Sequence, residues 1–229
     1  MTTATLANRI TQINPATLET IGEFEISTPE DVHRAVASAR RALPGWASKT
    51  PAERAKILAR LRPLLAERAE EVALAITRST GKPLIESYSS EIFSVAYLLE
   101  YFLKFAPKML RPQKVDLPMM KWGGRKSTIE FRPVGVAGII SPWNYPFSIP
   151  MGEAVIGLLA GCTVVLKPSE VTPLVGRIVG ELFRDAGLPE GVFQMVQGPG
   201  STGGALIESK PDKIFFTGGT PTGRRIMEA

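Results

Sequence analysis

From residue 134 onward, short apolar runs alternate with longer stretches in which apolar residues recur at helical spacing. Each of four runs rich in β-branched residues is followed by one such stretch. The predicted strands are 134–140, 163–167, 192–196 and 213–217, and the predicted helices are 147–159, 174–186, 201–209 and one starting near Pro221. Strands that alternate with helices form a parallel sheet with helices packed on its faces. This half of the chain is therefore predicted to be an α/β, Rossmann-like fold with helices on both faces.

The first half of the chain shows helical spacing without such strands. Two segments, 28–31 and 50–53, begin with Thr-Pro and carry an acidic residue three positions after the threonine, which is a helix start signal. We expect the second helix to run to about Ile76. A third helix is predicted over 84–105, with Pro107 ending it. The N-terminal region is therefore predicted to be helical.

Between these halves, residues 115–133 contain two extended runs that flank Gly123-Gly124. Glycine accepts the positive φ angles that a tight hairpin turn requires. The pattern predicts a protruding β-hairpin, and its charged outer residues indicate an exposed arm.

The composition is that of an ordinary globular chain, with 44% hydrophobic and 21% charged residues among 229. The net charge is +5, but the basic residues are scattered, so we expect neither a nucleic-acid nor a membrane partner. The single cysteine excludes internal disulfides and cysteine-rich zinc sites, and we expect no metal. The first residues lack the apolar core of a secretory signal, so we expect a cytoplasmic protein.

Parallel sheets bind ligands at the carboxyl ends of their strands. Four loops are therefore the candidate binding segments: 141–146, 168–172, 198–202 and 218–223. Residues 198–203 match the pattern G-x-G-x-x-G, although the match follows the third predicted strand, where a lone match is not specific. Gly218 and Gly219 could present backbone N–H groups to an anion, or they could form a simple turn.

Two further loops carry polar side chains with two open interpretations each. Lys167, Ser169 and Glu170 follow a buried strand, where Lys and Glu could bind ribose hydroxyls and the acid would repel a 2′-phosphate. They could equally form a charged surface turn. Asn144 lies between Pro142 and Pro146, so its amide N–H₂ could be held rigidly as an oxyanion donor. It could also be a structural asparagine that closes a turn.

Two residues that invite a catalytic role are interpreted as structural. Cys162 lies at the amino end of a predicted strand, which is the edge of the sheet opposite to the ligand-binding edge, and we expect it to be buried. His33 stands alone in the first predicted helix, and we expect a surface or packing role for it.

Several stretches together resemble the aldehyde dehydrogenase superfamily over nearly the whole chain. They are PVGVAGIISPWNYPF, AGCTVVLKPSEVTPL, AGLPEGVFQMVQGPG and FFTGGTPTGRRI, together with the upstream GWASKTPAERAKIL and TGKP. The resemblance implies NAD(P)-dependent oxidation of an aldehyde to a carboxylic acid, with NAD favoured and NADP as the alternative. It also implies a cofactor domain at 1–114 and 134–229, a homo-oligomer, and an oligomerisation hairpin at 115–133.

The resemblance implies a role for each loop residue. Asn144 would supply the side-chain amide of the oxyanion hole. The cofactor would be held at the channel by Ile140, Ser141, Pro142 and Trp143, at the adenosine ribose by Lys167 and Glu170, near the adenine by Gly200 and Gly204, and at the pyrophosphate by Gly219. The predicted cofactor site also includes Ser169, Phe216, Gly218 and Gly223.

The sequence departs from the family pattern in two ways. Gly219 stands where the family usually has a small hydroxyl residue. The family's catalytic cysteine and general-base glutamate follow the segment that resembles this chain, so neither can be placed on it. We therefore expect a truncated member that lacks the catalytic domain and is inactive alone.

Two other functions stay open at this stage. A non-catalytic protein could bind NAD or pair with a full-length relative through the hairpin. A conventional alcohol or hydroxy-acid dehydrogenase using 198–203 would need a proton-transfer residue near the nicotinamide, and the sequence offers no candidate.

Overall fold

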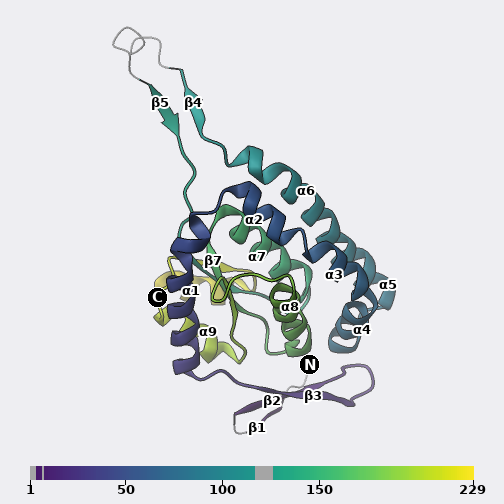
Figure 1. The fold of residues 1–229 in the computed structure, drawn as a ribbon. Coiled ribbons are helices and arrows are strands. Elements are labelled where there is room, and N and C mark those ends of the chain that lie inside the picture. Colours follow the sequence, from purple (N-terminus) through teal and green to yellow (C-terminus); the bar gives the residue numbers. More distant parts are fainter. Residues whose placement is uncertain (1–3, 7, 117–125) are drawn as a thin grey trace.

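A computed structural model describes residues 4–6, 8–116 and 126–229 of the chain (Figure 1). Its centre is a four-stranded parallel sheet in the order β8-β7-β6-β9. The strands are β6 (Val136–Ile140), β7 (Thr163–Lys167), β8 (Phe193–Met195) and β9 (Lys213–Phe216). Ile140 pairs with Lys167 on one side and with Phe216 on the other, so these three strands end at the same edge. The predicted parallel sheet is confirmed.

Helices cover both faces of this sheet, as the alternation of strands and helices predicts. On one face, Ala137, Ile139 and Val164 pack with buried residues of α7 (Ser148–Ala160) and α8 (Pro173–Asp185). On the other face, Val136 and Val165 pack with α1 (Pro29–Ala47) and α9 (Gly200–Glu208). Successive side chains of a strand point to opposite faces, which divides the core into these two clusters. The last helix is α10 (Thr220–Glu228), which contains no buried residue.

Both predicted helix starts carry complete capping boxes, at Thr28 with Asp31 and at Thr50 with Glu53. The prediction of a single helix from the second start to about Ile76 is wrong. The chain instead forms three helices, α2 (Pro51–Leu58), α3 (Leu61–Glu67) and α4 (Ala69–Thr80). Pro63 has no N–H to donate to the carbonyl of Ala59, and its ring would clash with that carbonyl in a continuous helix.

The third predicted helix is longer and less regular than expected. It consists of α5 (Leu84–Glu86), a π-helical turn η1 (Ser87–Ile92) and α6 (Phe93–Met109). Pro107 lies inside α6 and does not end it. The proline removes one hydrogen bond, but the next turn still closes because Leu110 N donates to Ala106 O at 3.0 Å.

The arms of the predicted hairpin are present as β4 (Gln113–Val115) and β5 (Ser127–Ile129), which pair antiparallel. Figure 1 shows this ribbon projecting away from the rest of the chain. The predicted Gly123-Gly124 turn lies outside the described residues.

The sequence analysis missed an antiparallel sheet made of β1 (Ala4–Leu6), β2 (Arg9–Ile13) and β3 (Thr20–Glu25). Its alternation is obscured by Gln12, a polar residue that is fully buried. Gln12 Oε1 accepts a hydrogen bond from Leu174 N at 3.1 Å in the first turn of α8. A buried amide at this position therefore caps a helix distant in sequence, which a strand pattern cannot reveal.

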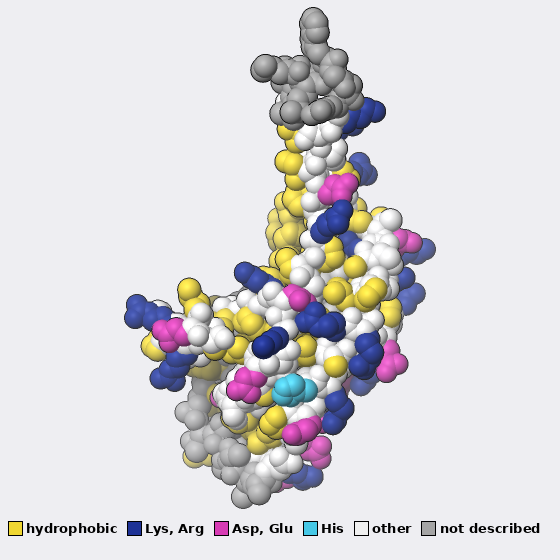
Figure 2. Space-filling model, turned by 90° about the vertical axis from the view of Figure 1, so that its left-hand side faces the viewer, with side chains coloured by type: hydrophobic (Ala, Val, Ile, Leu, Met, Phe, Trp, Pro, Cys, Tyr) yellow, Lys and Arg dark blue, Asp and Glu magenta, His cyan; other side chains and the backbone are white. Residues whose placement is uncertain are grey.

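The surface and the cysteine agree with the sequence analysis. Figure 2 shows basic side chains dispersed among acidic and other residues over one face, where the single histidine is exposed. Cys162 is 4% exposed and directly precedes β7. No helix in the described part of the chain is long and apolar enough to cross a bilayer.

Candidate functional site

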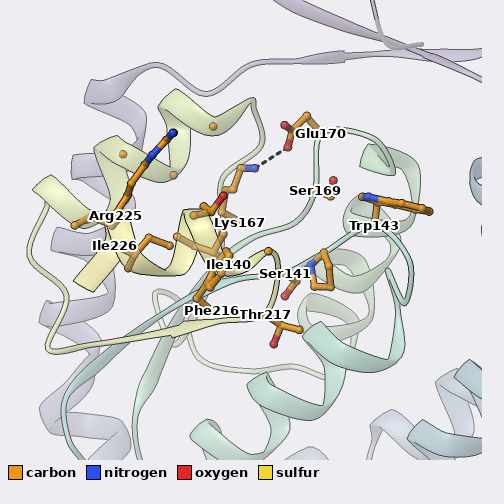
Figure 3. A pocket seen from close by; sticks show the side chains of 18 of the residues that line it. Ile140, Ser141, Trp143, Lys167, Ser169, Glu170, Phe216, Thr217, Arg225 and Ile226 are labelled. Carbon is orange, nitrogen blue, oxygen red and sulfur yellow. Dashed lines mark hydrogen bonds and ion pairs between the residues drawn. The ribbon is translucent and has the colours of Figure 1, made fainter. Parts of the chain in front are cut away.

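A cavity of about 650 Å³ opens at the carboxyl edge of the sheet (Figure 3). Residues from the ends of β6, β7 and β9 form one side, and residues of α9 and α10 form the other. The predicted residues that line it are Ile140, Ser141, Pro142, Trp143, Lys167, Ser169, Glu170, Gly200, Gly204, Phe216, Gly218 and Gly219. Residues far apart in sequence meet here because parallel strands end at one edge.

Two predicted site residues do not line this cavity. Asn144 has an exposed side chain and follows Trp143, the last residue of its loop to line the cavity. Gly223 lies against the ring of Phe216: a Cβ added to Gly223 would be 3.4 Å from Phe216 Cε1. Gly223 is not among the residues that line the cavity.

The sequence analysis missed several lining residues. They are Gly203, Ile207, Thr217, Thr222, Arg225, Ile226 and Ala229. A signal for two of them was present: in α9, Gly203 and Ile207 are spaced by four residues and so share a helix face. Gly198, the first glycine of the G-x-G-x-x-G match, does not line the cavity. An added Cβ there would lie 2.0 Å from Thr202 Oγ1, so its role is close packing.

The glycines of α9 leave the cavity wall open. A Cβ added to Gly200 or Gly204 would meet no atom within 4 Å, and one added to Gly203 would lie 3.8 Å from Ile140 Cδ1. Side chains at Gly200 and Gly204 would therefore project into free space at the cavity wall. The bare backbone gives a flat group room to lie against the helix, which fits the adenosine part of a dinucleotide.

The charged residues of the cavity lie on different elements. Lys167 Nζ, from a side chain that is 5% exposed, forms an ion pair with Glu170 Oε2 at 2.9 Å (Figure 3). Arg225 enters from α10. Ser169 Oγ accepts from Val171 N at 3.2 Å, so this hydroxyl shapes the turn that presents Glu170. The Lys–Glu pair offers a donor and an acceptor side by side, a combination that suits vicinal hydroxyls.

The loop that carries Asn144 is hydrogen-bonded to a charged pair, Lys82 and Glu91, whose contacts were not predicted from the sequence. Glu91, in η1, is fully buried and accepts from Phe147 N at 2.8 Å and from Ser148 N at 3.1 Å. Its other oxygen pairs with Lys82 Nζ at 2.6 Å. Lys82 lies in the TGKP stretch, which the sequence analysis noted without assigning it a role.

A second carboxylate, that of Glu153 in α7, is partly buried next to the site. Its Oε1 accepts from Thr217 Oγ1 at 2.9 Å. Burial raises the pKa of the Glu153 carboxyl, and the hydrogen bond from Thr217 offsets only part of this shift.

Replacing Glu153 with glutamine should raise the free energy of unfolding at pH 8. This increase should become smaller as the pH falls toward 4.5, the ordinary pKa of a glutamate. The folded state holds the Glu153 proton more tightly than the unfolded state, so ionisation costs folding free energy above the raised pKa and costs nothing below the ordinary one. Urea unfolding of both proteins across this range measures the difference. Glu67→Gln, at an exposed glutamate of α3, is the matched control. A gain from Glu153→Gln that does not vary with pH would contradict this account.

Among residues 4–6, 8–116 and 126–229, no three His, Cys, Asp or Glu side chains gather in a way that could hold a metal ion.

Comparison with known proteins places these features in context. The family model described as "Aldehyde dehydrogenase family" matches residues 2–229. A 4,4′-diapolycopene aldehyde oxidase of Methylomonas sp. is 38% identical over 219 residues, which is 96% of this chain and 41% of that protein.

Solved structures show the same relationship. An aldehyde dehydrogenase from Brucella melitensis biovar abortus 2308 superposes with a TM-score of 0.89 at 35% identity, covering 96% of this chain and 45% of that one. The NAD+ complex of an aldehyde dehydrogenase from Bacillus cereus has a TM-score of 0.88 at 33% identity, with the same coverage. The chain thus spans less than half the length of the relatives it matches.

Proposed function

The chain belongs to the aldehyde dehydrogenase family, and from this premise we propose that its protein oxidises an aldehyde to a carboxylic acid with NAD. The observation that carries the proposal is the cavity at the carboxyl edge of the sheet, which has bare glycines on one wall and the Lys167–Glu170 pair on the other. The activity is proposed for the whole protein, because this chain spans 41% of the Methylomonas relative.

The residues of the cavity divide the binding of the cofactor among them. Lys167 donates to one ribose hydroxyl and Glu170 accepts from its neighbour, and the Glu170 carboxylate repels a 2′-phosphate, which favours NAD over NADP. The adenine lies against Gly200 and Gly204. Gly219 is the N-cap of α10. Pro221 has no N–H, and Thr222 N and Gly223 N both donate to Gly219 O at 3.1 Å, so the backbone N–H groups of Gly219 and Thr220 are the ones that bind the pyrophosphate. NAD, when bound, supplies the hydride acceptor.

Asn144 acts on the substrate side. Its side-chain amide donates to the oxygen of the aldehyde carbonyl as negative charge develops there, which stabilises the transition state. Cys162 is buried before β7 and does not line the cavity, so we do not assign it as the nucleophile. We assign neither a nucleophilic thiol nor a general base within residues 1–229.

We further propose that residues 1–114 and 134–229 form the cofactor domain and that the arm at 115–133 joins copies of the protein. The antiparallel β4–β5 ribbon and its projection from the chain support this role (Figure 1). A short two-stranded ribbon is marginally stable alone, and pairing with another copy would stabilise it.

Substitution of Gly204 by valine should weaken NAD binding about 10- to 100-fold. The new side chain occupies space that the adenosine needs, and overpacking of this size costs about 1–3 kcal/mol. Titration calorimetry with NAD and NADP measures both affinities, and NAD should bind the wild type more tightly. Gly45→Val is the matched control, because Gly45 in α1 also has open space around an added Cβ but lies outside the cavity. Unchanged NAD affinity in Gly204→Val would place the adenosine elsewhere.

A further inference from the structure

We propose that Lys82 and Glu91 are positioning residues for Asn144: the pair holds the loop from Asn144 to Ser148 so that the Asn144 amide meets the substrate in one orientation. The inference rests on the proposed role of Asn144 as oxyanion donor. It gives a function to TGKP, the stretch that contains Lys82.

Glu91 fixes the end of the loop. Helix α7 begins after Phe147 without a side-chain cap from its own N-cap residue. The Glu91 carboxylate takes this place, because it accepts from both Phe147 N and Ser148 N. A carboxylate at a helix N-terminus is stabilised by the free N–H groups and the helix dipole. The start of α7, four residues after Asn144, is therefore held by a side chain from η1.

Lys82 fixes the beginning of the loop. Its ammonium group donates to Asn144 O at 2.9 Å and lies 4.6 Å from the centroid of the Tyr145 ring. The same group is paired with Glu91 Oε1 at 2.6 Å, and its side chain is only 15% exposed. A carbonyl held by a partly buried cation fixes the peptide plane after Asn144, and with it the direction in which the Asn144 side chain leaves the backbone.

The local backbone explains how this pair reaches the loop. Gly81 adopts φ +78° and ends α4, so the chain turns and Lys82 leaves the helix. The π-helical turn η1 then carries Glu91. A π-turn contains more residues than an α-turn, so it rotates the side chains that follow, and such turns are frequent at functional sites. Thr77 Oγ1, 2.9 Å from Ser87 Oγ, ties η1 to α4.

The Lys82–Glu91 pair is needed because the side chains around Asn144 are exposed to solvent and few other contacts in the described part of the chain restrain them. Trp143 and Tyr145 are 43% and 42% exposed, and Asn144 between them is also exposed. The prolines at 142 and 146 restrict their own φ angles and the backbone of the residue before each, but they do not restrict the backbone of Asn144 itself. An oxyanion donor works only when it is held close to its productive geometry, and a displacement of about 1 Å can cost 100-fold in rate. The Lys82–Glu91 pair supplies that restraint at Asn144 O and at the start of α7.

The test substitutes Lys82 with methionine in the whole protein. We expect kcat to fall about 10- to 100-fold, with the Kd for NAD unchanged, because Lys82 lies outside the cavity lining. Lys104→Met is the matched control, since Lys104 also lies over an aromatic ring, that of Phe105, and is distant from this loop in the sequence. Its kcat should not change. Lys82→Gln keeps a hydrogen-bond donor for Asn144 O and should therefore lose less activity than Lys82→Met. If Lys82→Met does not fold, the same measurements are made on Lys82→Gln.

A double-mutant cycle separates positioning from general destabilisation. If Lys82 acts through Asn144, Lys82→Met should lower kcat less than about 2-fold in an Asn144→Ala background. An equal loss in both backgrounds would overturn the inference, as would a normal kcat for Lys82→Met where Asn144→Ala is impaired. If Asn144→Ala itself has normal kcat, the proposed oxyanion role fails instead, and this inference fails with it.

A readout without catalysis uses the chain itself. Amide hydrogen exchange at Phe147 and Ser148 should quicken in Lys82→Met and stay unchanged in Lys104→Met, while exchange in β7 stays unchanged in both. Unchanged exchange at Phe147 and Ser148 would show that Lys82 does not restrain the loop.

Discussion

Replacing Asn144 with alanine should lower kcat of the whole protein about 100-fold or more while leaving the Kd for NAD unchanged. The amide of Asn144 donates to an oxygen that carries negative charge only as the carbonyl is attacked. Loss of this amide therefore raises the activation barrier without weakening the binding of NAD. Removing one oxyanion donor costs about 100- to 1,000-fold in kcat in other enzymes.

Steady-state kinetics with a short aliphatic aldehyde, together with NAD titration, measures this effect. Asn14→Ala is a suitable control, because Asn14 accepts from Ala16 N in the turn between β2 and β3, and Asn14 is not among the cavity-lining residues. The competing interpretation is an asparagine that only closes its loop. In that case alanine should lower the melting temperature, and kcat per folded molecule should stay normal.

Replacing Gly135 with alanine should destabilise the protein by about 3 kcal/mol or more, which corresponds to about 6–12 °C in Tm for a chain of this size. Gly135 adopts φ +123°, a conformation that strains any other residue. An added Cβ would lie 2.2 Å from Asp212 Oδ2. That carboxylate cannot rotate away without losing its bond from Val136 N at 2.7 Å and its pair with Arg40 at 3.0 Å.

A disturbance at Gly135 should also affect the cavity, because Gly135 directly precedes β6 and the carboxyl end of β6 carries cavity residues. Urea unfolding of Gly135→Ala and of Gly45→Ala compares two glycines with opposite surroundings. Gly45 lies in α1 with no atom within 4 Å of an added Cβ, so alanine there should stabilise by about 0.4–1 kcal/mol. Equal stability of wild type and Gly135→Ala would show that the chain relaxes at β6 without cost.

The two chosen positions differ in how far the sequence could point to them. Asn144 is framed by two prolines directly after a predicted strand, so its place near the ligand edge follows from local pattern alone. Gly135 is one of 21 glycines, and what makes it irreplaceable is its φ of +123° together with the side chain of Asp212, 77 positions later in the printed sequence.

The sequence by itself determined the central architecture and the position of the cavity. Strand and helix periods are local properties, so the alternation after residue 134 predicts a parallel sheet, and the carboxyl ends of its strands predict the cavity. Twelve of the predicted site residues line that cavity; the strand-end loops pointed to some of them, and the family resemblance named the others. Helix boundaries were less secure, because a helix break precedes Pro63, whereas Pro107 lies inside α6.

Only the tertiary structure decided which buried polar groups meet. Gln12 caps α8 from 162 residues away, and Lys82 and Glu91 reach the Asn144 loop across separations of 62 and 56 residues. The sequence shows these side chains as ordinary polar positions. A buried charge or amide is costly unless partners satisfy it, and the partners of these groups come from segments that packing, not local pattern, brings together.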